Sequence, residues 1–551
     1  MSNKYKPPPE DKIHRETIRE TEIFHENNPD ISNPLEVIDI SRLTPGHPLL
    51  KPFHPMEVKS IIKTFKNKAP GADTIRRHHA EHFPNILFVI LTKIYNYCLA
   101  TGYYPIKFKQ GIMIFIGKPG KDLSHPKNYR PITLLNLIGK AFGKLINIRL
   151  VHHLESGDHL NPLQYGFRRG RGCESSLALM YEYVCRKLRS GDKHKISVIS
   201  RDISGAFDRV WHQKLVVLFD KVDLHPLFTK LLANFLSNRE IRVKIGNHMG
   251  PAFTPEAGVP QGAPDSPDIF NISTLPLEDL QPTPNSYMPW YADDLHMFIA
   301  TQGNNIRRHR CHMEEALKKQ DSFERTRGIL TCPEKSIITS ISHTNKRGPI
   351  SYELGDETVK YNFLPRGKTT KILGLNISKF SWTTQHVDII ANKTNNIVSM
   401  LYAAREMAQA EKILLVKSLI IPSLSYPSVP LNTCPITSFC KLQAVLNRAL
   451  KFSFGVRYPD VPTARSLLDR AKIKPMNQTI HKRASNIWHK LEQGIAGDKD
   501  TYRMIKGINL IKNNRNFPSS LKRAEKEEPP PINSWMDKSN ARVKAFYNNN
   551  N

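Results

Sequence analysis

The spacing of apolar residues divides the first part of this chain into a polar stretch and two helical ones. From Pro55 apolar residues recur at helical spacing, which predicts a helix, and a second apolar helix is predicted over residues 83–100, where Gly102 ends it. Residues 1–54 are polar and proline-rich, with little periodicity. We therefore expect a loosely ordered lead-in followed by two helices.

Strand-like and helical patterns then follow one another. Residues 111–121 alternate like a strand that runs into a turn, and residues 195–200 form a second predicted strand. Residues 134–153 predict an amphipathic basic helix, and the apolar residues of 207–222 fall on one helical stripe. Beyond residue 385 helix-like segments dominate, with basic residues throughout.

The charge of the chain narrows the choice of partner. The chain has 551 residues and a formal net charge of +30, with a pI of about 9.7. A polyanion relieves the self-repulsion of such a charge, so nucleic acid is the expected partner. A basic protein that is merely soluble is the alternative. The length allows several domains, each with its own core.

Other classes are disfavoured by composition. The longest apolar window is too short and too polar to span a bilayer, and the N-terminus has no apolar core typical of a secretory signal. We expect no membrane partner. Seven cysteines are scattered without a C-x-x-C pair or zinc-finger spacing, which indicates free thiols in a reducing compartment.

Two adjacent acids lie between apolar runs in the stretch MPWYADDLHMF. This pattern predicts a strand, a tight turn and a strand, with Asp293 and Asp294 at the tip. Neighbouring carboxylates on a rigid apolar base are costly without a cation, and hard oxygen ligands suit Mg²⁺. An ordinary hairpin turn is the alternative.

A third acid, Asp202, follows an apolar strand in the stretch ISVISRDISGAFD. Together with Asp293 and Asp294 it would form a three-carboxylate site, which could hold two metal ions about 3.5–4 Å apart for a phosphoryl displacement. Asp208 follows on a predicted helix whose axial rise carries it away from the strand end. We expect Asp208 to be a helix-surface residue and not a metal ligand.

Two further segments could contact a nucleotide. In EAGVPQGAPDSPDIFNI, Gly262 would let the backbone approach a planar ligand, and Ser266 predicts a capped helix start. In KPGKDLSHPKNYRPITLL, Lys118, Lys121 and Arg130 could hold a triphosphate, with a solvated basic loop as the alternative.

These segments, in this order, resemble the successive motifs of a reverse transcriptase of the non-LTR (LINE-type, jockey/CR1-like) retrotransposons. The resemblance rests on PKNYRPITLLNLIGKAFGKLINIRL, QYGFRRGRGCESSL, RDISGAFDRVW, GVPQGAPDSPDIFN and YADD. KAPGADTIRRHHAEHFP and TGYYPIKFKQGIMIFI resemble the stretch before the fingers, and CPEKS, TKILGLNIS and SLIIPSLSYPSV resemble the later palm motifs and the thumb. The resemblance covers residues 55–460, and five ordered motifs are jointly specific.

The resemblance implies roles for the acids and for one lysine. Asp202, Asp293 and Asp294 would bind two catalytic Mg²⁺ ions, with Asp202 and Asp293 the essential pair. The carbonyl of Ile203 would add a metal ligand. Lys335 matches the lysine that protonates the leaving pyrophosphate.

It also implies nucleotide contacts. The ring of Phe207 would act as the steric gate that excludes a ribose 2′-hydroxyl and so selects dNTPs. Gln261 and Gly262 would contact the pair formed by the template base and the incoming nucleotide. Lys118 and Arg130 would hold the triphosphate.

The implied fold is α+β, a right-hand polymerase with an antiparallel palm sheet and a helical thumb and C-terminal region. Leu373 and Gly374 would lie in the primer grip. The expected division is a lead-in (1–54), a helical N-terminal extension (55–100), fingers (101–194), palm (195–222), a fingers/palm connection (223–254), palm (255–384), thumb (385–470) and a basic helical tail, partly disordered (471–551).

The sequence departs from the family pattern at three positions. Asp265 is an added acid, expected near the nucleotide, where the family has an aliphatic residue after PQG. Pro333 stands in CPEKS where asparagine is common, and Gly143 stands where a glutamate is usual. These changes bear on the level of activity, while all the expected catalytic acids are present.

The expected partners are an RNA template, a DNA primer or target and dNTPs. No nuclease is visible in the sequence, so we expect an endonuclease supplied elsewhere and, by family analogy, action in the nucleus. An RNA-dependent RNA polymerase is the closest enzymatic alternative, with Asp208 recognising a ribose, although Phe207 and the YADD turn argue against it. A catalytically weak or inactive retroelement-derived RNA-binding protein is the other alternative.

Overall fold

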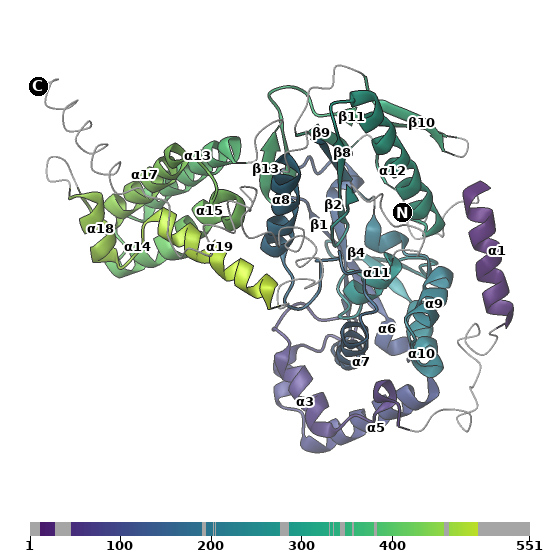
Figure 1. Cartoon of the computed structure of the whole chain (residues 1–551). Helices are drawn as coiled ribbons and strands as arrows, with labels where there is room; N and C mark the ends of the chain where they lie inside the picture. Colours follow the sequence, from purple (N-terminus) through teal and green to yellow (C-terminus); the bar gives the residue numbers. More distant parts are fainter. Residues whose placement is uncertain are drawn as a thin grey trace, which may run out of the picture.

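A computed structural model describes most of the chain between residues 12 and 493 (Figure 1). The described residues are 12–27, 46–189, 194–201, 203, 205–275, 286–329, 331–333, 335–341, 348–354, 357–378, 383–456 and 462–493. No helix among them is long and apolar enough to cross a membrane.

The N-terminal part is helical. Its elements are α1 (Lys12–Asn27), η3 (Pro48–Leu50), α3 (Pro55–Thr64), α4 (Arg77–Glu81), α5 (Asn85–Thr101) and α6 (Ile106–Lys109). Both helices predicted here are confirmed, and α5 ends at Gly102, whose φ of +66° suits a residue without a side chain. The expectation of a loosely ordered lead-in is wrong for α1, which packs against α9 (His212–Lys221) and α12 (Ile306–Thr326).

A four-stranded sheet comes next, in the order β2-β1-β4-β5. Its strands are β1 (Gly111–Gly117), β2 (Tyr129–Leu135), β4 (Ile241–Ile245) and β5 (His248–Phe253). The helices that follow β2 are α7 (Leu137–Ser156) and α8 (Cys173–Arg189). The helix predicted from residue 134 therefore begins three residues later, because Leu134 and Leu135 pair with β1 as the end of β2.

A second, larger sheet holds the predicted acidic hairpin. It runs β10-β11-β9-β3-β8-β6, with β7 also paired to β8. Its strands are β3 (His194–Arg201), β6 (Ser286–Tyr287), β7 (Trp290–Tyr291), β8 (Asp294–Gln302), β9 (Ile337–Ser340), β10 (Ile350–Leu354) and β11 (Glu357–Phe363). All described pairings in it are antiparallel except that of β9 with β11. The predicted strand 195–200 is confirmed as β3.

Five helical elements from this part of the chain contribute residues to the hydrophobic core. They are η5 (Ala206–Arg209), α9, α10 (Pro226–Leu236), α11 (Ser266–Ser273) and α12. The single helical stripe predicted over 207–222 is wrong, because the chain makes the 3-10 turn η5 and starts a new helix at His212. The predicted helix start at residue 266 is confirmed, but Ser266 is not its cap, because Asp265 occupies that position.

A helical bundle lies to one side of the sheets (Figure 1). A short hairpin of β12 (Thr369–Ile372) and β13 (Leu375–Ser378) leads into it. The bundle contains α13 (Thr384–Leu401), η7 (Tyr402–Ala404), α14 (Gln409–Leu415), η8 (Val416–Ile420), α15 (Ile421–Ser425), α16 (Ser428–Leu431), α17 (Ile436–Ser453), α18 (Ala464–Ala471) and α19 (Met476–Glu492). The predicted helical character beyond residue 385 is confirmed.

Helix α19 joins the bundle to the larger sheet. Met476 and Ile480 enter the bundle core, whereas Ala484 and Trp488 enter the core formed by α8, β3 and β8. Residues 476–492 of the expected tail therefore form a helix that packs on both the bundle and the larger sheet. Residues 494–551 of that tail lie outside the described residues.

Candidate active site

The predicted acidic hairpin is present. Trp290 pairs with Leu295 and Tyr291 with Asp294, so Ala292 and Asp293 are the two turn residues. The two carboxylates therefore sit on adjacent residues, Asp293 in the turn and Asp294 at the start of β8, and both residues are exposed. Behind them the side chains of β8 are buried from Leu295 to Thr301. A rigid apolar strand thus carries two exposed hard oxygen ligands.

The third predicted acid, Asp202, lies outside the described residues, but its neighbours are described. Arg201 pairs with Leu295 of β8, the residue next to Asp294. Ile203 is buried, at 7% exposure, and forms a bridge with Thr331. The strand end that precedes Asp202 is therefore beside the acidic hairpin, as the sequence predicts. No group of three or more potential metal-ligating residues occurs among the described residues, a set that lacks Asp202.

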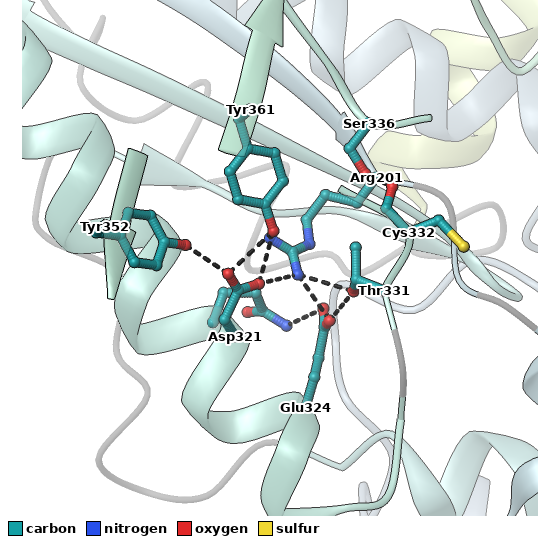
Figure 2. Close-up of polar contacts among 9 residues, drawn as sticks. Arg201, Asp321, Glu324, Thr331, Cys332, Ser336, Tyr352 and Tyr361 are labelled. Carbon is teal, nitrogen blue, oxygen red and sulfur yellow. Dashed lines mark hydrogen bonds and ion pairs between the residues drawn. The ribbon is translucent and has the colours of Figure 1, made fainter. Parts of the chain in front are cut away.

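Arg201 is the centre of a buried charged network (Figure 2). Its side chain has no exposed surface and forms ion pairs with Asp321 and Glu324 of α12, the latter at 2.7 Å. It also donates to the Tyr361 hydroxyl at 3.0 Å and to the Thr331 hydroxyl at 2.8 Å. The two carboxylates hold the pKa of Arg201 above its ordinary value despite the opposing effect of burial. The guanidinium is thus permanently charged and fixes the end of β3.

Two tyrosines complete the acid side of this network. Tyr352 and Tyr361, from β10 and β11, both donate their hydroxyl groups to Asp321, the second at 2.8 Å. Thr331 donates to Glu324 and, through its bridge with Ile203, connects the network to the chain after Asp202. The same loop continues to Lys335, which is exposed. The network therefore joins the two chain segments that carry Asp202 and Lys335.

Phe207 lies in an aromatic group beside this strand end. Its ring stacks on that of Phe270 of α11, with centroids 4.8 Å apart, and meets the ring of Phe167 edge-on at 5.8 Å. Two rigid neighbours fix the orientation of the Phe207 ring. A fixed ring at this position could restrict the shape of a ligand that lies above it.

The glycine loop is held between η5 and β2. The amides of Gly258 and Val259 donate to the carbonyls of Val210 and Phe207, at 2.8 and 2.7 Å. On the other side Thr133 donates its amide to the Gln261 carbonyl at 2.8 Å. The loop therefore links the larger sheet region to the four-stranded sheet at residue 133.

Asp208 fixes the side chain of Gln261. The Gln261 amide donates to the Asp208 carboxylate, with Nε2 and Oδ1 2.9 Å apart. Asp208 is 2% exposed, so the expectation of a helix-surface residue is wrong. The sequence could not show this contact because the two residues are 53 positions apart. Gln261 is thereby oriented, while Gly262 beside it remains exposed.

We expect Gly258→Ala to destabilise this loop. A Cβ at residue 258 would lie 2.6 Å from the Asp208 carbonyl oxygen, and the φ of +85° is unfavourable for alanine. Gly303 is a matched control, because its φ is +91° and nothing lies within 4 Å of its added Cβ. In urea unfolding we expect Gly258→Ala to cost about 1–3 kcal/mol more than Gly303→Ala. Equal costs would show that the loop yields without penalty.

The remaining predicted residues fall on three separate elements. Lys118 follows β1, and its Nζ donates to the Lys127 carbonyl at 2.9 Å, whereas Arg130 on β2 is exposed. Leu373 and Gly374 form the two-residue turn between β12 and β13, both with positive φ. The hydroxyl of Tyr426 donates to the Leu373 carbonyl, so the bundle contacts this turn directly.

The comparisons with known proteins identify the domain. A family model described as "Reverse transcriptase (RNA-dependent DNA polymerase)" matches residues 116–377, which hold the acidic hairpin, the glycine loop and Phe207. The chain carries a reverse transcriptase domain of the non-LTR retrotransposon type. This confirms the resemblance read from the motifs, and the mixed architecture described above is the α+β right-hand fold expected for such a domain.

Three curated relatives show how far the similarity extends. The "Probable RNA-directed DNA polymerase from transposon X-element" of Drosophila melanogaster is 26% identical over 459 residues, 81% of this chain and 48% of the relative. The corresponding protein of transposon BS is 29% identical over 46% of this chain and 28% of the relative. The RNA-directed DNA polymerase from mobile element jockey of Drosophila funebris is 31% identical over 40% of this chain and 24% of the relative. The chain therefore spans about half the length of these relatives, or less.

Among solved structures the likeness is remote. The telomerase of Candida tropicalis in complex with a fragment of telomeric RNA aligns over 81% of this chain and 68% of that chain, with a TM-score of 0.37 and 11% identity.

In this reverse transcriptase domain Asp265 is an interior residue. It is fully buried, so its carboxylate is not exposed to a bound nucleotide. Its Oδ1 lies 4.0 Å from the place that a Cβ on Gly143 of α7 would occupy. The two departures from the family pattern, Gly143 and Asp265, therefore face each other across the contact between α7 and α11. Burial raises the pKa of Asp265 from 3.8 to about 7.

This carboxyl should make stability depend on pH. A pKa raised on folding means that the folded state binds the proton more tightly, so the unfolding free energy falls as pH rises from about 4 to about 7. We expect Asp265→Asn to flatten that dependence and to be the more stable protein at pH 8. Urea unfolding of both proteins across this pH range is the measurement. A wild-type curve parallel to that of the variant would contradict the assignment.

Proposed function

We propose that this chain is an RNA-directed DNA polymerase that transfers dNTPs onto a primer 3′-hydroxyl. The observation that carries the proposal is the hairpin turn with two adjacent exposed aspartates, inside a domain that matches the reverse transcriptases. The curated relatives are named as RNA-directed DNA polymerases, and the proposal extends that activity to this chain.

Reverse transcriptases depend on a divalent metal, and the donors here suit one. Asp293 and Asp294 offer hard carboxylate oxygens on adjacent exposed residues, which fits the preference of Mg²⁺. We propose that these two acids, with Asp202 and the carbonyl of Ile203, hold two Mg²⁺ ions. The bound ions would neutralise the charge that develops on the reacting phosphate and activate the primer hydroxyl.

The residues of the chain would position the other reactants. Lys118, directly after β1, and Arg130, on the neighbouring strand β2, would bind the triphosphate. Gln261, held by Asp208, would contact the nascent base pair together with Gly262. Lys335 would donate a proton to the leaving pyrophosphate. Leu373 and Gly374, held by Tyr426, would support the primer end. Catalysis would then come mainly from positioning and from charge neutralisation.

The fixed ring of Phe207 is proposed to select the sugar. Phe207→Val removes the part of the ring that would meet a 2′-hydroxyl, so we expect UTP incorporation relative to dTTP to rise by about 10²-fold, a steric discrimination of about 3 kcal/mol. The measurement is primer extension on poly(rA)/oligo(dT) with each nucleotide. Phe65→Val is the control, because Phe65 ends α3, outside the proposed site, and is only partly buried. An unchanged ratio of UTP to dTTP incorporation in Phe207→Val would refute the proposal that the Phe207 ring excludes a 2′-hydroxyl.

The same assay tests the function itself. Incorporation of dTTP in preference to UTP by the wild-type protein supports a reverse transcriptase, whereas the reverse preference indicates an RNA polymerase. RNA binding without incorporation would favour the alternative of a retroelement-derived RNA-binding protein. The proposed partners are an RNA template and a DNA primer in the nucleus, with the primer end made by an endonuclease supplied elsewhere.

A further inference from the structure

The segment 161–166 runs directly beside the acidic hairpin. The amide of Tyr165 donates to the Trp290 carbonyl at 2.8 Å, and the amide of Trp290 donates to the Leu163 carbonyl at 2.9 Å. Gln164 also forms a β-bridge with Trp290. The segment thus pairs with β7 through one parallel bridge at Trp290, two residues before the acidic turn begins at Ala292.

The side chain of Gln164 reaches the turn itself. Its Oε1 accepts the Ala292 amide at 2.9 Å, and its Nε2 donates to the Ala292 carbonyl at 3.3 Å. The same Oε1 accepts the Gly166 amide at 2.8 Å. Gln164 is 1% exposed, so these groups have no access to bulk water. One buried primary amide therefore satisfies both backbone polar groups of the first turn residue.

Ala292 needs such support because of its backbone. Its φ is +55°, a conformation that an alanine adopts only at an energetic cost. Its amide lies in a buried place, where an unpaired donor would cost about 1–3 kcal/mol. Gly166 lets the segment come this close, because a Cβ on residue 166 would lie 2.2 Å from the Ala292 nitrogen.

The base from which Gln164 acts is itself fixed. The amide of Gln164 donates to the Asn161 carbonyl at 3.0 Å, and the Leu163 amide donates to the Asn161 side chain at 2.9 Å. The buried guanidinium of Arg168 bonds the Asn161 carbonyl at 2.9 Å and forms an ion pair with Glu155 of α7. The support for the turn is thus anchored to the body of the domain.

We propose that Gln164 is a positioning residue that holds the Ala292–Asp293 turn in the geometry from which Asp293 and Asp294 act. The inference rests on the proposed polymerase function. Asp293 follows Ala292 directly, so a shift of the Ala292 peptide plane would move the carboxylates relative to the strand end of β3. Gln164 would contact neither nucleotide nor primer, and its effect would pass only through the backbone of the turn.

Two substitutions distinguish the acceptor function of the Gln164 side chain from its donor function. Gln164→Met keeps the length of the side chain and removes its three hydrogen bonds to Ala292 and Gly166. Gln164→Glu keeps an acceptor for the two amides but, when ionised, loses the donor to the Ala292 carbonyl. A protonated glutamic acid can both accept and donate, as glutamine does. Gln302→Met is the matched control, because Gln302 is exposed at the far end of β8.

The experiment is single-nucleotide extension on poly(rA)/oligo(dT), with kcat, KM for dTTP, the Mg²⁺ concentration at half-maximal rate and duplex affinity measured for each protein. We expect Gln164→Met to lower kcat about 10–100-fold, with KM and duplex affinity within about threefold of wild type. The Mg²⁺ requirement should rise several-fold. We expect the activity of Gln164→Glu relative to wild type to rise as pH is lowered from about 8.5 to about 6.

Failure of the Gln164 inference can be distinguished from failure of the proposed polymerase function. Wild-type kcat and Mg²⁺ dependence in a folded Gln164→Met protein would overturn the inference while leaving the polymerase intact. Activity lost only in proportion to folded protein, with an unchanged Mg²⁺ requirement, would also overturn it by showing a purely structural role. An inactive wild-type protein would instead be a failure of the proposed function.

Discussion

Replacement of Asp293 by asparagine should abolish DNA synthesis while leaving the protein folded. Asp293 is exposed in a two-residue turn, so the change removes one charge without opening a cavity. An amide oxygen is a weaker ligand than a carboxylate for a hard divalent cation. Loss of the main source of charge neutralisation should cost about 10³-fold or more in kcat. Primer extension on poly(rA)/oligo(dT) measures the loss.

The control for this prediction is Asp220→Asn, an exposed aspartate on α9 outside the proposed site. We expect that variant to match wild type in kcat. Both variants should keep wild-type affinity for the duplex, since the net charge of the chain rises by only one. Retained synthesis by Asp293→Asn would mean that the acidic turn is an ordinary hairpin.

Removal of the buried cation Arg201 should have the largest effect on stability. Arg201→Met would leave Asp321 and Glu324, at 6% and 2% side-chain exposure, as two like charges without their cation. Breaking a buried ion pair by removing one partner costs about 3–5 kcal/mol. We expect a loss of that size in urea unfolding. Synthesis should fall as well, because Arg201 fixes the strand end next to Asp202.

A control variant and a triple variant test whether the loss of stability comes from the unpaired carboxylates. Arg366→Met, at an exposed arginine, should change stability by less than about 0.5 kcal/mol. Adding Asp321→Asn and Glu324→Gln to Arg201→Met removes both uncompensated charges and should recover part of the loss. If Arg201→Met alone costs less than about 1 kcal/mol, the network does not hold β3.

The sequence predicts the site best where the signal is local. The acidic hairpin is recognisable because apolar residues flank a turn within eleven positions, and strand β3 shows as a short apolar run. Five ordered motifs then identify the domain. The acids of the site could therefore be named without knowledge of the fold.

The residues that support those acids could not be found in the same way. Arg201 lies 120 positions from Asp321 and 160 from Tyr361, and Gln164 lies 128 from Ala292. Contacts over such separations leave no periodic pattern in one sequence.

Features that depend on tertiary contacts could not be predicted from the sequence either. Helix α1 contains few apolar residues and lies against α9 and α12. Asp265 follows a glycine loop and looks like a surface acid, yet the contact between α7 and α11 buries it. In both cases the position in the fold overrides the local preference of the residues.

The most direct test of the proposed polymerase activity is pre-steady-state incorporation of a single dTTP by the purified chain, bound to poly(rA)/oligo(dT) with Mg²⁺, beside Asp293→Asn on the same duplex. We expect a burst of extended primer from the wild-type protein and none from the variant, at equal amounts of bound duplex. Equal bound duplex with no extension by either protein would contradict it and leave a domain that binds RNA without copying it.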